Sequence, residues 1–163
     1  MSNNLIEIRN LSVSFPSEAG VVQAVRDVSL DIRAGEVLGI VGESGSGKTV
    51  MSLAMIRLLA RTASVSGSII HDGVNLLQLT DDAMSKYRGK EISMIFQDPL
   101  SALNPVHTIG HQIIEALQIH SQMNKNDALK RAIELLEIVG IPRPAERAQS
   151  YPHEFSGGMR QRV

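Results

Sequence analysis

A glycine-rich segment, Gly42–Thr49, carries the residues whose types and spacing point most directly to chemistry. It meets the pattern G-x-x-x-x-G-K-[ST] through Gly42, Gly47, Lys48 and Thr49. Glycines let a backbone wrap around an anion, with successive N–H groups pointing inward at the positive end of a helix. Lys48 would reach the β- and γ-phosphates of a nucleoside triphosphate, and the Thr49 hydroxyl would bind Mg²⁺. The segment therefore predicts a triphosphate site, with ATP expected.

The alternative is a glycine-rich turn that matches this pattern by chance. Average residue usage gives such a match about once in a hundred chains of this length. The flanking segments favour the functional interpretation. An apolar run, Val37–Val41, precedes the loop and is typical of a strand buried on both faces. The run from Thr49 to Leu59 is nearly all apolar, which predicts a helix buried all round, with Met51 and Met55 packing in a core.

Two further segments narrow the class of phosphate-binding protein, because a phosphate loop alone is shared by many unrelated functions. Ile95–Pro99 reads as the end of a strand that exposes the Gln97 amide. Phe155–Arg162 contains Ser156, Gly157 and Gly158, whose backbone can approach phosphate closely at a helix start. Ser-Gly-Gly alone is also compatible with a simple turn. The class of protein is therefore indicated by the order and spacing of the three segments together.

The elements that must position these residues alternate in type along the chain. Period-two apolar spacing predicts strands at 6–15, 28–32 and 66–70, and a short apolar run predicts another at 92–96. Asp72-Gly73 is expected to form a turn and Thr80 to begin a helix. Two further helices are expected at 109–121 and 126–139, the second ending at Gly140. The pattern is α/β.

The composition argues against several classes of protein and of metal site. The 163 residues have 43% hydrophobic and 20% charged residues, a net charge of −1 and no cysteine. The sequence therefore has no disulfide framework and no thiolate metal site. No apolar run reaches the roughly 20 residues of a membrane-spanning helix, and the start does not resemble a signal peptide. With 3% aromatic residues and no basic block, nucleic acid is not an expected partner.

Taken together, these segments resemble the ATP-binding subunits of ABC transporters over the whole chain. Gly42–Thr49 matches the Walker A motif and Gln97 the Q-loop glutamine. Phe155–Arg162 resembles the signature motif, with Phe155 for the usual leucine and Met159 for the usual glutamine. The resemblance implies an α/β fold, an incomplete P-loop NTPase core with an N-terminal antiparallel β-subdomain and a helical insert.

The resemblance also implies roles for individual residues. Lys48 and Gln97 would take part in catalysis, and Thr49 and Gln97 would bind Mg²⁺. Phe15 would stack on adenine, although a core phenylalanine is the alternative. Ser156, Gly157 and Gly158 would act in trans on ATP held by a partner. The implied ATP-contacting set is Phe15, Gly42, Glu43, Ser44, Gly45, Ser46, Gly47, Lys48, Thr49, Val50, Ser156, Gly157 and Gly158.

A closer resemblance is to the dipeptide/oligopeptide importer branch. It rests on Gly42–Lys48, on Gln97-Asp98-Pro99 with Leu103-Asn104-Pro105, and on Tyr151-Pro152-His153. The implied function is the ATP-binding subunit of a peptide importer, with nickel or glutathione import as the alternative within the branch. A soluble ABC ATPase acting on nucleic acid is the alternative from another class, and a product that only binds nucleotide or misfolds is a third.

The resemblance implies partners and a location. These are a second ATPase subunit bound head to tail, two transmembrane permease subunits, and indirectly a periplasmic or extracellular solute-binding protein. The chain would lie peripherally at the cytoplasmic face of the (inner) plasma membrane. Its expected divisions are a β-subdomain at 1–36, the P-loop core at 37–98, and the helical subdomain with the signature at 99–163.

The family's later motifs are the Walker B aspartate, the catalytic glutamate, the D-loop and the switch histidine. They follow the signature, and this sequence ends at Val163. We therefore expect a C-terminally truncated ABC domain whose intact parent is an ATP hydrolase, while this chain alone is poorly stable and inactive. Metal binding by His107 and His111 is weighed against a surface helix start, which is preferred.

Overall fold

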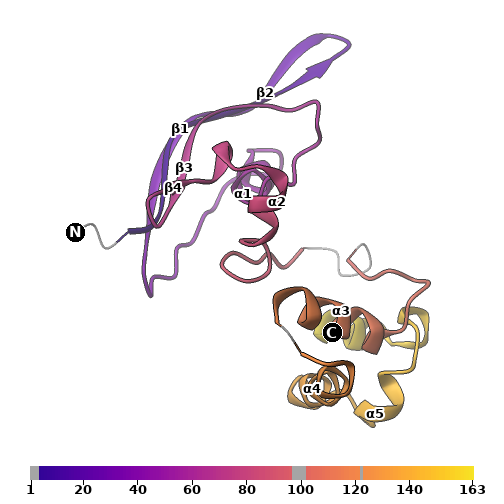
Figure 1. The fold of residues 1–163 in the computed structure, drawn as a ribbon. Helices are drawn as coiled ribbons and strands as arrows, with labels where there is room; N and C mark the ends of the chain where they lie inside the picture. Colours follow the sequence, from indigo (N-terminus) through magenta and orange to yellow (C-terminus); the bar gives the residue numbers. More distant parts are fainter. Residues whose placement is uncertain (1–3, 97–101, 122) are drawn as a thin grey trace. The chain divides into compact units, whose positions relative to one another are not determined.

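The computed structural model describes residues 4–96, 102–121 and 123–163. The chain forms two compact units, the first ending at Ile92 and the second beginning at Ser93. Figure 1 shows the strands in the first unit and a group of helices in the second. No helix in the described ranges combines the length and apolar character needed to cross a bilayer.

The first unit is built on a four-stranded antiparallel sheet with the order β2-β1-β3-β4. Its strands are β1 (Asn4–Ser17), β2 (Gly20–Arg33), β3 (Ser64–His71) and β4 (Val74–Asn75) (Figure 1). Alternate residues of β1 point into the core, as the period-two spacing predicts. The buried side chains of the sheet are Ile6, Ile8, Leu11, Val13, Val25 and Ile69. The three predicted strands of the sheet are therefore confirmed, and β2 starts eight residues earlier than expected.

The middle of the sheet is bulged where β1 meets both neighbours. The β1–β3 register shifts between Arg9 and Ser12, and Asn10 has a φ of 49°. Asp27 on β2 has the same φ of 49°, and the Asn10 side-chain amide donates to its carboxylate over 2.8 Å. Opposite the bulge, Gly67 has a φ of 97°, and a Cβ there would lie 2.5 Å from the Asn10 carbonyl oxygen. Only glycine fits this position.

Charged side chains link the two long strands on the exposed side of the sheet. Arg9 on β1 forms ion pairs with Asp31 on β2 and with Glu7, the latter over 3.0 Å. The hydrogen bond to Asp31, together with attraction to the Asp31 and Glu7 charges, raises the pKa of Arg9, while desolvation opposes the rise. Because the group is solvent-exposed, we expect this pair to set strand register more than stability.

Two local predictions in the first unit are confirmed. Asp72 and Gly73 turn the chain between β3 and β4 with φ values of 47° and 78°, as in a type I′ hairpin. A short 3₁₀ helix, η1 (Leu76–Gln78), leads to α2 (Asp81–Ser85). The Thr80 hydroxyl accepts a hydrogen bond from the Ala83 amide over 3.2 Å, which caps α2.

The predicted helix after the phosphate loop is shorter and more exposed than expected. Helix α1 spans Lys48–Met55, and only Met51 and Ala54 within it are buried. Arg57, two residues beyond, has a φ of 53° and breaks the helical path. The prediction of a helix at 49–59 buried all round is therefore wrong. Its apolar residues cover one face only, against the β-sheet.

The two predicted core strands, 37–41 and 92–96, are also wrong, since neither is a strand in the structure. Val37 is 98% exposed and Ile95 98% exposed. A strand needs neighbours that accept and donate its backbone hydrogen bonds. In the described part of the chain, the only such contact of either segment is a single parallel bridge between Arg88 and Ile92. An apolar run indicates that a segment can be buried. It does not indicate which other strand would form hydrogen bonds with its backbone.

The second unit is helical. Its elements are α3 (Ile109–His120), α4 (Lys125–Ile138), α5 (Pro144–Arg147), the 3₁₀ helix η2 (Pro152–Glu154) and α6 (Gly157–Arg162) (Figure 1). The two long helices were predicted, and α4 ends just before Gly140, whose φ is 71°. The buried cluster that joins them comprises Ile109, Leu136, Ile141, Ala148 and Phe155.

The start of α3 is locked onto the segment that precedes the signature. The amides of Ile109 and Gly110 donate to the carbonyls of Ser150 and Ala148 over 2.9 and 2.8 Å. A Cβ at Gly110 would lie 2.6 Å from the Ala148 carbonyl oxygen, so this approach requires glycine. Phe155, which stands where the family has leucine, is only 2% exposed and fills the core beneath α6. The signature segment therefore packs against the hydrophobic core of its own unit.

Candidate functional site

The phosphate loop passes directly into helix α1. Gly47 is the N-cap residue, with φ 90° and ψ 0°, and Gly45 has a φ of 80°. A Cβ at Gly47 would lie 2.3 Å from the carbonyl oxygen of Ala24 on β2. Side chains are therefore excluded at Gly47 both by backbone conformation and by space. The sequence places these glycines where the loop must turn against the sheet.

Lys48 bends back over the loop from the first position of α1. Its Nζ donates to the carbonyl oxygens of Gly42 and Glu43, each over 2.7 Å, and to the Ser46 hydroxyl over 3.1 Å. No carboxylate pairs with this ammonium in the ranges that the structure describes. The Lys48 ammonium is therefore bonded by neutral oxygens alone. Its positive charge is not balanced by a carboxylate and can attract an anion.

Backbone donors gather at the same place. The first hydrogen bond of α1 runs from the Met51 amide to the Gly47 carbonyl over 2.9 Å. The amides of Lys48, Thr49 and Val50 precede it, and the first amides of an α-helix have no acceptor within the helix. They stand at the positive end of the helix dipole. Amides, ammonium and dipole together suit a phosphate group, and the Thr49 side chain is exposed beside them.

A cavity of about 570 Å³ adjoins this loop and is walled by β2. Its lining includes Gly42, Lys48, Val25 and Arg26. Phe15 is half-buried on β1 in register with Val22, and it is not among the described residues that line this cavity. Adenine stacking by Phe15 therefore stays a prediction.

The signature segment forms a capped helix start in the second unit. The Ser156 hydroxyl accepts from the Met159 amide over 3.3 Å, so Ser156 caps α6 at the helix start that the sequence predicts. A Cβ at Gly157 or Gly158 would meet no atom within 4 Å. The backbone at both glycines is therefore open to a large group from outside. Gln97 lies outside the described residues, so its metal-binding and catalytic roles stay predictions.

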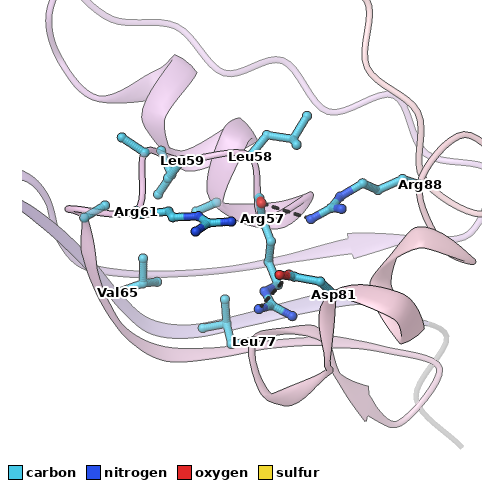
Figure 2. Close-up of a pocket in the computed structure, with 11 residues that line it drawn as sticks. Arg57, Leu58, Leu59, Arg61, Val65, Leu77, Asp81 and Arg88 are labelled. Carbon is cyan, nitrogen blue, oxygen red and sulfur yellow. Dashed lines mark hydrogen bonds and ion pairs between the residues drawn. The ribbon is translucent and has the colours of Figure 1, made fainter.

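A second cavity in the first unit, of about 710 Å³, lies beyond the end of α1 (Figure 2). Arg57 donates to the Leu79 carbonyl and lies 3.5 Å from an Asp81 carboxylate oxygen. Arg88 donates to the carbonyls of Ile56 and Arg57 over 2.7 and 3.0 Å. Figure 2 shows Arg88 reaching toward Arg57 and the Arg57 side chain pointing toward Asp81. Two of the three arginines that line this cavity, Arg57 and Arg88, therefore stabilise the turn that follows α1.

The histidines offer no assembled metal site in the part of the chain that the structure describes. The His107 and His111 rings stack with centroids 4.6 Å apart and planes 12° apart, beside the Thr108 cap of α3. His71 is buried at 5% exposure, with its Nδ1 lacking a hydrogen-bond partner, and the Tyr87 ring stands edge-on to it at 5.9 Å.

The sequence did not predict the hydrogen bonds of one side chain, Arg162. Arg162, four residues after Gly158, donates to main-chain carbonyls at the end of α4 and within the signature. The only signal for it in the sequence is a basic residue one helical turn beyond the glycines. Nothing in that spacing identifies the distant carbonyls as its acceptors.

Known proteins similar to this chain include several transport ATP-binding proteins. The oligopeptide transport ATP-binding protein OppD of Bacillus subtilis is 50% identical over 161 residues, covering 98% of this chain and 45% of that protein. The protein of the same name from Mycobacterium tuberculosis is 49% identical, covering 98% of this chain and 26% of that protein. The dipeptide transport ATP-binding protein DppD of Bacillus subtilis is 48% identical, with coverages of 98% and 48%.

Solved structures give the same fold. A dimeric bacterial ABC transporter cassette superposes with a TM-score of 0.81 at 28% identity, covering 96% of this chain and 66% of the cassette. The chain spans about a quarter to a half of the length of the curated relatives it matches. The family described as ABC transporter matches residues 25–163, which is most of the sequence. The chain therefore belongs to the ABC transporter family.

Proposed function

We propose that this chain binds ATP with Mg²⁺ and serves as the ATP-binding subunit of an ABC importer that takes up peptides. The observation that carries the proposal is the phosphate loop, where Lys48 Nζ sits over the Gly42 and Glu43 carbonyls at the start of α1. Gly47 packs closely on the Ala24 carbonyl, where a side chain would not fit. The donor set of amides and ammonium fits a chain of phosphates.

Each residue of the loop has a distinct part in the proposal. Lys48 neutralises charge on the outer phosphates, and the amides of α1 bind their oxygens. The exposed Thr49 hydroxyl supplies an oxygen ligand of the kind that Mg²⁺ prefers, and Gln97 supplies another. When bound, the metal would neutralise charge that develops on the phosphates during hydrolysis. Ser46 holds Lys48 through its hydroxyl.

The proposal extends to a composite site shared by two copies. Ser156, Gly157 and Gly158 would contact ATP held by the phosphate loop of a partner ATPase subunit. Two observations support this. Both glycines are open to an approaching group, and a similar cassette was solved as a dimer bound to ADP and Pi. The intact protein would hydrolyse ATP at this composite site and drive two permease subunits at the cytoplasmic face of the membrane.

The substrate class comes from the relatives. Relatives 48 to 50% identical to this chain are named for oligopeptide or dipeptide transport. That favours peptides over nickel or glutathione as the solute. No residue described here contacts the solute in this proposal, because an ATPase subunit lies outside the membrane path.

The metal part of the proposal is tested at Thr49. We expect Thr49→Val to keep its metal-free ATP affinity and to lose about tenfold of the affinity that Mg²⁺ adds, because only the ligand oxygen is removed. Titration calorimetry with and without Mg²⁺ measures both values. Ser52→Ala is the matched control, since the Ser52 hydroxyl bonds the Lys48 carbonyl within the same helix. A wild-type chain that does not bind ATP would overturn the proposal.

The transport part is tested by purification from membranes. We expect the tagged full-length protein, extracted with mild detergent, to bring down two hydrophobic permease subunits in equal amounts. Mass spectrometry of the purified complex identifies them. Recovery with nucleic acid and without membrane proteins would instead support the soluble class of ABC ATPase.

A further inference from the structure

Arg162 joins two segments that are distant in sequence. Its Nη1 donates to the Gly140 carbonyl over 2.7 Å and to the Val139 carbonyl over 3.1 Å. Its Nε donates to the Gly158 carbonyl over 3.3 Å. One guanidinium therefore bonds both the end of α4 and the middle of the signature. The planar fork of arginine is suited to this because its donors point in fixed and different directions.

The two acceptors are the carbonyl of the C-cap residue of α4 and the carbonyl of the residue that follows it. Val139 is the C-cap residue of α4, and the Gly140 amide already bonds back to the Glu137 carbonyl over 2.9 Å. Carbonyls at this end carry the negative pole of the helix dipole, so a cation is favoured there. A Cβ at Gly140 would lie 3.1 Å from Arg162 Nη1. Glycine at this position thus leaves room for the guanidinium.

The acceptor at Gly158 lies within the segment proposed to contact phosphate. The peptide unit between Gly158 and Met159 is held at both ends, since its carbonyl accepts from Arg162 and its N–H donates to the Ser156 hydroxyl. Two consecutive glycines allow many backbone conformations. Helix α6 has only six residues, too few to stabilise itself. The conformation of these glycines therefore depends on bonds that tie α6 to the rest of its unit.

We propose that Arg162 is a positioning residue, which fixes the backbone of Ser156–Gly158 by tying α6 to the carboxyl end of α4. This inference rests on the proposed function, in which that backbone binds the ATP of a partner subunit. Arg160, the other arginine of the helix, does not share the role, since its Nε is buried with no partner among the described residues. Arg162 acts through the main chain and need not touch the nucleotide.

The test compares Arg162→Ala with Arg131→Ala in the full-length protein. Arg131 is the control because its partner is Glu134, in an exposed ion pair on the surface of α4. We expect Arg162→Ala to keep its ATP affinity within about twofold, because the phosphate loop belongs to the other unit. ATP-driven association of two copies, measured by sedimentation, should weaken at least about tenfold. Amide exchange at Met159 and Arg160, whose N–H groups donate to the Ser156 hydroxyl and carbonyl, should accelerate by a similar factor.

Conservative variants separate positioning from general stability. Arg162→Lys should recover part of the association, because an ammonium can still bond the α4 carbonyls but has no second arm for Gly158. Should Arg162→Ala fail to fold, Arg162→Gln decides, since its amide reaches only one of the two ends. We expect that variant to fold, to associate weakly and to exchange faster at the Met159 and Arg160 amides.

Several results would overturn the inference, and they differ from failure of the proposed function. Wild-type protein that binds no ATP removes the proposed function. Wild-type protein that binds ATP without associating removes the composite site and the inference with it. Association of Arg162→Ala or Arg162→Gln at wild-type strength, in a wild-type protein that does associate, removes the inference alone. So does acceleration of exchange spread evenly over the helical unit.

Discussion

Lys48→Ala is expected to lower the affinity for ATP with Mg²⁺ by about a hundredfold or more. The Nζ of Lys48 is held by three neutral oxygens of the loop, from Gly42, Glu43 and Ser46. Without it, two carbonyls face the incoming phosphates with no cation between them. Charge-assisted hydrogen bonds to phosphate are about twice as strong as neutral ones, and here one ammonium would serve several phosphate oxygens. Titration with a fluorescent ATP analogue measures the loss.

The control for this change is Lys90→Ala. Lys90 belongs to the same unit, and its ammonium lies 3.7 Å from Glu91 in an exposed pair worth little to stability. This variant should bind ATP as the wild-type chain does. Normal ATP binding by Lys48→Ala, in a variant with an unchanged circular dichroism spectrum, would refute the assignment of the loop.

Gly67→Ala is expected to lower stability more than alanine at the other glycine of the strands, Gly20, where a Cβ meets no atom within 4 Å. The new Cβ would lie 2.5 Å from the Asn10 carbonyl oxygen and 2.6 Å from the Arg9 carbonyl oxygen. Both are backbone atoms in a hydrogen-bonded strand, so the clash cannot be relieved by a side-chain rotation. The φ of 97° adds backbone strain. We expect the free energy of unfolding, from urea titration, to fall by about 3 kcal/mol or more.

Gly73→Ala separates the clash from the strain. Gly73 also has a positive φ, 78°, but a Cβ there meets no atom within 4 Å. We expect its cost to be about 1 kcal/mol, the usual penalty for alanine in this backbone region. Equal losses for the two variants would mean that the β1–β3 bulge adjusts to admit a methyl group.

The features of this fold that could be predicted best are those set by residues close together in the sequence. The glycine pattern located the loop and the first residue of α1 within one position. Alternation predicted β1, and a hydroxyl before two acids predicted the Thr80 cap of α2. The end of α4 followed from Gly140. Each of these features is decided by residues within a few positions of one another, so a single sequence contains the required information.

Features that depend on distant partners could not be predicted. The apolar run 37–41 resembles a core strand, yet pairing is a property of two segments and only one is visible in the run. Gly67 looked like an ordinary strand residue because the bulge that requires it is on β1. The bonds of Arg162 could not be predicted because its acceptors, Val139 and Gly140, are more than twenty positions away. Gln97 lies outside the described residues, so its predicted role is untested.

The two units each bury a separate set of apolar side chains, one around Ile8 and the other around Phe155. Damage to the loop in one unit need not spread to the signature in the other. If two copies share their sites as proposed, a subunit with a broken loop and one with a broken signature would together still form one intact site. A cell carrying both defective alleles would then regain part of its transport, which is intragenic complementation arising from independent hydrophobic cores.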